Sequence, residues 1–228
     1  MAYNNVLVDN TKLYSQEDLD TMASEFLNTL RTIDRPGIEN LVEYIDTKTD
    51  FRTAPASSRF HGNFEGGALV HFINAYNCFN NLCDNYNIML SPDSRKIIGL
   101  LHDFCKFNLY KKTTRRHFIE EQDKWITYVT YEFKNGEIPL GHGEKSVMLL
   151  QQFIKLSRLE MLAIRWHMGA YEEGALRNGL NEASEYHPCV RAMQIADQMA
   201  TAFYDPKVDA KKLVTKKVNI GEKQIDTL

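Results

Sequence analysis

Two residues whose side chains bind metal ions, His102 and Asp103, stand next to each other among apolar residues, and Lys106 follows them. Burying an imidazole beside a carboxylate is costly unless something binds both groups. A divalent metal ion would take one nitrogen and one oxygen ligand from this pair. On a helix, Lys106 would lie on the same face as both ligands. A cation at this place would attract an anionic substrate. An ordinary buried hydrogen bond between His102 and Asp103 is the alternative.

Further residues of the same types occur in similar settings along the chain. Of the seven histidines, His71, His102, His142 and His167 each sit at or within a different apolar helical pattern. Asp197 falls on the apolar face of a later helix, where a carboxylate needs a partner. With Asp103, these residues supply four imidazoles and two carboxylates, enough for two divalent metals that share one carboxylate. Their order on successive helices, rather than any one of them, predicts a metal site.

Helical periodicity supplies the elements that must position these residues. Two glycines precede the pattern that holds His71 and allow a tight turn or a close approach there. The pattern that begins at Ser91-Pro92 predicts an inward-facing helix on which His102 and Asp103 both lie. Helix starts are predicted at Ser15, Pro36-Gly37, Gly66-Gly67, Ser91-Pro92, Gly141, Ser157 and Pro188. Residues 170–187 are polar and predict a loop.

One β element is predicted. The run from Trp125 to Phe133 is rich in aromatic and β-branched residues, and Asn135-Gly136 is a strong signal for a type I′ turn. Residues 137–140 would return as the second strand. The predicted fold class is therefore mainly α, a helical bundle with a small inserted β-hairpin. A central sheet of many strands would contradict it.

Composition restricts the class of protein. The chain has 228 residues, of which 43% are hydrophobic and 25% charged, and its formal net charge is −3. We expect a soluble cytoplasmic protein without a membrane partner, because no secretion signal and no membrane-length apolar run is seen. Its four cysteines show no Cys-x-x-Cys spacing and predict reduced thiols. With a negative net charge, any affinity for nucleic acid must be local. One basic cluster predicts either a solvated loop or a contact with phosphates, and it consists of Lys111, Lys112, Arg115 and Arg116.

The order of these motifs resembles the HD-domain superfamily of metal-dependent phosphohydrolases, over about residues 50–203. The matching segments are Gly66–His71, Leu101–Lys106, Gly141-His142, Trp166–Gly169 and Ala196-Asp197. The motif order is closest to the HD domain of bacterial 3′–5′ exoribonucleases, but no OB-type nucleic-acid module is recognised before it. Trp166 also stands where the family often has a further histidine. The resemblance predicts an N-terminal helical extension over 1–49, an HD domain over 50–205 and a polar tail over 206–228, with little of the tail in the core.

The resemblance also implies roles for the residues. His71, His102, Asp103 and Asp197 would hold a first metal, and His142 and His167 a second, with Asp103 as the bridge. We expect the second metal to bind more weakly, because only two ligands besides the bridge belong to it. The ions would be one or two of Mn, Fe, Ni, Co, Zn or Mg. Asp103 and Lys106 are the predicted catalytic residues, and Lys106 would neutralise charge on the phosphoryl group. Further candidates for substrate contacts are Arg59, His61, Arg165 and the basic cluster Lys111, Lys112, Arg115 and Arg116.

Several functions share this site. The prediction is hydrolysis of a phosphate ester or anhydride in a small nucleotide-like substrate, because one short basic cluster offers no track for a polynucleotide. One alternative is a 3′–5′ exonuclease or a cyclic-dinucleotide phosphodiesterase, and steeply salt-dependent binding would indicate it. Another is an HD-type di-iron oxygenase, which would consume oxygen. A further alternative is a binding module without enzymatic activity. The complete ligand set argues against it, because such a module would be expected to have lost some of the ligands.

Overall fold

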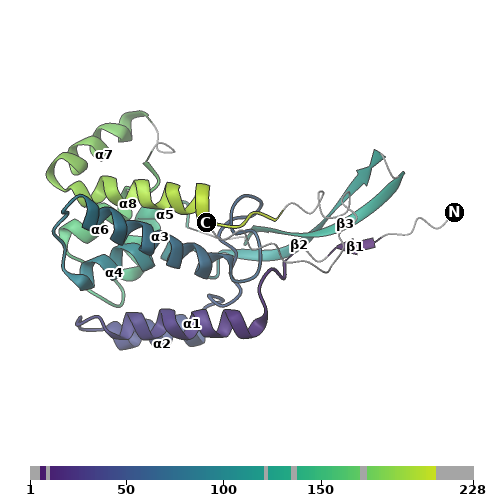
Figure 1. Cartoon of the computed structure of the whole chain (residues 1–228), viewed down its shortest axis with the longest axis horizontal. Helices are drawn as coiled ribbons and strands as arrows, with labels where there is room; N and C mark the ends of the chain where they lie inside the picture. The colour runs from purple at the N-terminus through teal and green to yellow at the C-terminus, as the bar shows by residue number, and fades with distance from the viewer. Residues whose placement is uncertain (1–5, 9–10, 121–122, 135–137, 170–173, 209–228) are drawn as a thin grey trace.

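The computed structural model of the chain describes residues 6–8, 11–120, 123–134, 138–169 and 174–208. Its helices gather in one body, from which a long β-ribbon projects (Figure 1). The prediction of a mainly helical protein is confirmed. Among the described helices, none combines the length and the apolar character that a membrane span requires.

The first two helices cover one side of the body. α1 (Gln16–Arg31) begins after Ser15 as predicted. Ser15 and Asp18 form a capping box, in which the Ser15 hydroxyl accepts from the Asp18 amide and the Asp18 carboxylate accepts from the Ser15 amide. α2 (Ile38–Lys48) lies beside it. Their apolar faces join buried residues of later helices in one apolar cluster.

α3 (Gly67–Asn85) starts where the chain makes an unusually close approach. Gly66 precedes the helix in the left-handed region, with a φ of 79°. A Cβ atom on Gly67 would lie only 2.0 Å from the carbonyl oxygen of Gly62, so only glycine fits there. The contact holds the loop of His61 and Gly62 over the first turn of α3, near His71.

α4 (Pro92–Leu101) is capped by Ser91 as predicted, but it ends before the ligand pair. The prediction that His102 and Asp103 lie within the helix is wrong. His102 is the C-cap, and Asp103 opens a 3₁₀ turn, Phe104–Lys106, in which the Lys106 amide bonds to the Asp103 carbonyl. Such tightening is common at helix ends, and here it directs Asp103 and Lys106 to the same point.

The remaining helices complete the body. α5 (His142–Leu150) and α6 (Arg158–Arg165) pack together closely, because Gly143 leaves room for the carbonyl oxygen of Arg165. α7 (Gly174–Tyr186) contradicts the predicted loop over 170–187, of which residues 170–173 lie outside the described residues. α8 (Pro188–Met199) starts at its proline as predicted and continues into a π-helical segment, Ala200–Tyr204.

The ribbon consists of β2 (Tyr110–Ile119) and β3 (Lys124–Phe133), paired antiparallel with Tyr110 opposite Phe133. β1 (Val6–Val8) pairs parallel with the other edge of β3, which gives the order β1-β3-β2. The predicted strand over 125–133 is confirmed, but its predicted partner is wrong. Residues 138–140 form no strand, and Asn135-Gly136 lies outside the described residues.

The missed strand β2 carries the basic cluster, which the sequence predicted as a loop. Its cations obscured a run that also contains threonine, phenylalanine and isoleucine, residues that favour strands. Charged side chains are tolerated on a solvent-exposed ribbon, and aromatic cross-strand neighbours stabilise it: the Phe118 and Trp125 rings lie 5.3 Å apart.

Candidate metal centre

Six predicted ligands come together from five parts of the helical body. They are His71 on α3, His102 and Asp103 after α4, His142 at the start of α5, His167 after α6 and Asp197 on α8. The side chains of His71, His102 and His167 are fully buried, and that of Asp103 is 1% exposed. His142 is 32% exposed and Asp197 15%, so solvent reaches the cluster at these two residues.

One group of ligand atoms faces Oδ2 of Asp103. The Nε2 atoms of His71 and His102 lie 3.2 Å apart, and Asp197 Oδ1 lies 3.2 Å from His71 Nε2. Asp103 Oδ2 is 3.8 Å from His71 Nε2 and 3.6 Å from His102 Nε2. Two ligands each about 2.1 Å from one ion lie about 3.0–3.4 Å apart at octahedral or tetrahedral angles. The two 3.2 Å separations fall within this range. Those from Asp103 Oδ2, and the 3.9 Å between His102 Nε2 and Asp197 Oδ1, are slightly longer, so the four side chains would draw together a little around a single ion.

A second group faces the other oxygen of the same carboxylate. Asp103 Oδ1 lies 3.3 Å from His167 Nε2 and 3.4 Å from His142 Nδ1. These three atoms are buried, and none makes a hydrogen bond of good geometry within the described part of the chain. Unpaired buried polar atoms are costly, and a bound ion would satisfy all three. The Cys105 sulfur also lies nearby, within 4.8 Å of one ligand atom of Asp103 and one of His142.

Hydrogen bonds to the outer ring nitrogens direct the other nitrogens inward. His102 Nδ1 lies 2.9 Å from the Gly99 carbonyl oxygen, and His167 Nδ1 lies 2.7 Å from that of Ile164. A carbonyl oxygen only accepts, so Nδ1 carries the proton in both rings and Nε2 presents a lone pair. This is the usual support for metal-binding histidines. The residues present therefore fit a centre with one or two divalent ions.

Without an ion, protons and Lys106 balance the carboxylates. Burial lowers the pKa of His71, but hydrogen bonds to Asp197 and Asp205 raise it to about 9. The neighbouring Asp103 carboxylate raises the pKa of His142 to about 10. Lys106 Nζ lies 2.6 Å from Asp103 Oδ2. Burial opposes the charged form of this lysine, but Asp103 outweighs burial and raises the pKa, so Lys106 stays a cation.

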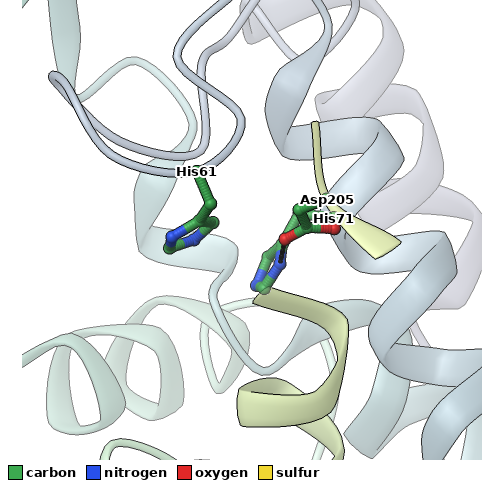
Figure 2. A group of neighbouring side chains, drawn as sticks. All are labelled: His61, His71 and Asp205. Carbon is green, nitrogen blue, oxygen red and sulfur yellow. Dashed lines mark hydrogen bonds and ion pairs between the residues drawn. The ribbon is translucent and has the colours of Figure 1, made fainter. Parts of the chain in front are cut away.

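The sequence missed Asp205, whose carboxylate belongs to the centre. Its Oδ2 accepts from His71 Nδ1 at 2.7 Å (Figure 2). Its Oδ1 accepts from Asn74 Nδ2 at 2.9 Å. Asp205 was assigned to the end of the domain, where a polar tail was expected. The eight-residue spacing from Asp197 was the available signal, because a helix continued through it would carry both carboxylates on one face.

His61 is a predicted substrate contact that lies beside one of the ligands. Its ring lies 5.1 Å from that of His71, and its Nε2 is buried without a hydrogen-bond partner among the described residues (Figure 2). Burial, and then the charges of Lys106 and His71, lower its pKa to about 4. The imidazole is therefore neutral at pH 7 and can accept or donate one hydrogen bond.

The other predicted contacts are already engaged or lie on the surface. Arg165 pairs with Glu144 at 2.5 Å and lies over the Trp166 ring, which fixes α5 to α6. Arg59 is exposed and lies over Phe60. On β2, Lys111 pairs with Glu132 at 3.0 Å, Lys112 pairs with Glu65, and Arg116 lies over Trp125. Arg115 is exposed on the same strand.

No protein-family model matches the chain, and no curated protein or solved structure matches it significantly. The resemblance to the HD-domain superfamily therefore stays a prediction that rests on the motifs. The geometry of the ligand cluster stands independently of it.

Proposed function

We propose that the chain is a metal-dependent phosphohydrolase that acts on a small, nucleotide-like phosphate ester or anhydride. The observation that supports this most is the position of Asp103. One oxygen of this buried carboxylate faces His71 and His102, while the other faces His142 and His167. A carboxylate with separate ligand groups on its two oxygens is suited to bridge two ions.

The chain's own residues have definable roles in such a reaction. Bound divalent ions would supply an activated water and polarise a phosphoryl oxygen. Lys106 keeps its charge beside Asp103 and would stabilise negative charge that develops on the phosphoryl group. His142 is the most exposed ligand, so we infer that the substrate enters from its side. The neutral imidazole of His61 would contact a substrate oxygen.

A small substrate agrees better with the ribbon than a polynucleotide does. A polynucleotide needs a continuous positive track with stacking aromatic rings. Lys111 and Lys112 point to opposite faces of β2, because neighbouring residues of a strand alternate. Both are also neutralised by glutamates. The role proposed for the basic cluster is therefore limited to outer phosphates, with the exposed Arg115 and Arg116 as the cations that would contact them.

The test is a screen of phosphate esters and anhydrides with Mn²⁺, Co²⁺, Ni²⁺, Fe²⁺, Zn²⁺ and Mg²⁺, combined with metal analysis of the purified protein. We expect phosphate release from mononucleotides that disappears in Asp103→Asn. Asp84→Asn is the matched control, because Asp84 pairs with Arg95 on the surface. Faster release of mononucleotides from RNA or DNA oligomers than of phosphate from mononucleotides would replace this proposal with the exonuclease. Metal-dependent oxygen consumption in the iron-loaded protein would replace it with the oxygenase.

A further inference from the structure

The segment that follows the π-helical turn is fastened to the loop in front of α3. The Gly62 amide donates to the Pro206 carbonyl at 2.9 Å. Asn63 and Val208 form a reciprocal pair, in which the Val208 amide donates to Asn63 Oδ1 at 3.0 Å and Asn63 Nδ2 donates to the Val208 carbonyl at 2.9 Å. We call this arrangement, residues 205–208 on residues 62–63, the clasp.

The clasp carries a carboxylate whose two oxygens are both used. Asp205 is 1% exposed at its side chain, and its amide donates to the Ala200 carbonyl at 2.8 Å. Oδ1 accepts from Asn74 and Oδ2 accepts from His71 Nδ1. Figure 2 shows the Asp205 carboxylate directly against the His71 ring. The backbone on one side and Asn74 on the other therefore fix the oxygen that His71 meets.

A separate ion at this place does not fit. His61, His71 and Asp205 offer ligand atoms within 4.8 Å of one another. His71 Nδ1, however, must carry a proton to donate to Asp205, and a protonated nitrogen has no lone pair for an ion. In the neutral ring, which an ion requires, this proton on Nδ1 leaves the lone pair on Nε2, which lies 3.2 Å from both His102 Nε2 and Asp197 Oδ1. The Asp205 carboxylate therefore acts on His71 and not on an ion of its own.

We propose that Asp205 is a positioning residue for the ion bound by His71, His102 and Asp197, and that the clasp makes this ion's affinity depend on residues 205–208. The inference rests on the metal binding assumed in the proposed function, but not on the reaction. When the clasp opens, Asp205 leaves His71, and the imidazole loses both its orientation and its fixed proton. Coupling between two equilibria is reciprocal, so a bound ion must also hold the clasp closed.

The first measurement is the affinity of the protein for Zn²⁺ by competition with a chromophoric chelator. Loss of a group that orients a metal-binding histidine typically costs about 10–100-fold in affinity, and we expect a loss of this size for Asp205→Asn. Asn63→Ala removes both hydrogen bonds of the Asn63–Val208 pair without touching a ligand, and should weaken binding less. Because it acts through Asp205, it should have little further effect in Asp205→Asn. Asp84→Asn is the control.

The second measurement is hydrogen exchange of the Gly62 and Val208 amides, which donate across the clasp. In the wild-type protein Zn²⁺ should slow both, and in Asp205→Asn this protection should be lost. Melting temperatures of the metal-free variants show whether they fold. Affinity equal to that of Asp84→Asn, or exchange that Zn²⁺ leaves unchanged, would overturn the clasp and leave the phosphohydrolase standing. Normal Zn²⁺ effects without any phosphate release would overturn the phosphohydrolase and leave the clasp standing.

Discussion

The two sides of the Asp103 carboxylate differ in how completely the protein has prepared them. On the Oδ2 side, His71 and His102 are fully buried, and each has its outer nitrogen bonded to a fixed acceptor. On the Oδ1 side, His167 is held in the same way, but His142 is 32% exposed at the edge of the cluster. Asp197 adds a second carboxylate to the Oδ2 side only.

This difference indicates that the two sides of the centre have different roles. A ligand group that is already oriented loses little conformational freedom when an ion binds, so the Oδ2 side should bind its ion more tightly. The Oδ1 side is nearer to solvent and has fewer carboxylates, which suits an ion that must also meet a substrate. Both sides depend on Asp103, and each depends separately on its own histidines.

The largest effect is expected for Asp103→Asn, which removes the charge that both sides share. Turnover should fall by about three orders of magnitude or more, since residues that act as a unit cannot be replaced singly. Metal analysis after dialysis should find less bound metal than in Asp84→Asn. Wild-type turnover with full metal content would show that Asp103 is not the bridge.

Single histidine variants separate the two sides. His71→Ala should lose the tighter ion and, with it, activity to a similar extent as Asp103→Asn. His142→Ala should keep one tightly bound ion, lose the weaker one and reduce turnover by about a hundredfold. The measurement is a metal titration beside the rate, with His187→Ala as the control at the start of α8. If both variants bind metal equally, the two sides are equivalent and the comparison fails.

The sequence predicted most of this centre because its ligands stand in apolar helical patterns that had to be buried. It also predicted the helix starts that carry a chemical signal, such as the capping boxes at Ser15 and Ser157. The ligand types and the element order together were enough to bring six residues to one place, although α4 ends at Leu101 and the pair lies just beyond it.

The features that could not be predicted from the sequence depend mainly on contacts between distant segments. The partner of β3 is chosen by pairing, and the four cations of β2 concealed its preference for a strand. The role of Asp205 depends on its contacts with His71 and Asn74, which lie more than a hundred residues away in the sequence. α7 was read as a loop because its polar residues give no long apolar stripe.

Lys106→Met tests whether the Oδ2 side also takes part in the reaction. The change keeps an unbranched side chain, one atom shorter than that of lysine, and removes the charge beside Asp103. We expect kcat to fall by about a hundredfold with little change in KM, because the charge acts where negative charge develops. Lys96→Met is the control, since Lys96 contacts Thr32 and Asp93 away from the ligands. A rise in KM alone would assign Lys106 to substrate binding.

The smallest effect is expected for Cys105, which would be a further ligand for the ion on the Oδ1 side. Cys78, Cys83 and Cys189 belong to an apolar cluster, whereas the equally buried Cys105 belongs to none of the clusters formed by the described residues. Its sulfur lies within 4.8 Å of ligand atoms of Asp103 and His142. A thiolate there would be a soft ligand and would favour Zn²⁺, Co²⁺ or Fe²⁺ over Mg²⁺.

The Co²⁺-loaded protein allows a direct reading of this contact, because a thiolate bound to Co²⁺ absorbs in the near ultraviolet. We expect this band in the wild type and in Cys78→Ser, and its loss in Cys105→Ser together with an affinity for the second ion that is about tenfold weaker. A band that survives in Cys105→Ser would place the thiol outside the centre. The Oδ1 side would then have only His142 and His167 beside the bridge, and the contrast between the two sides would be greater.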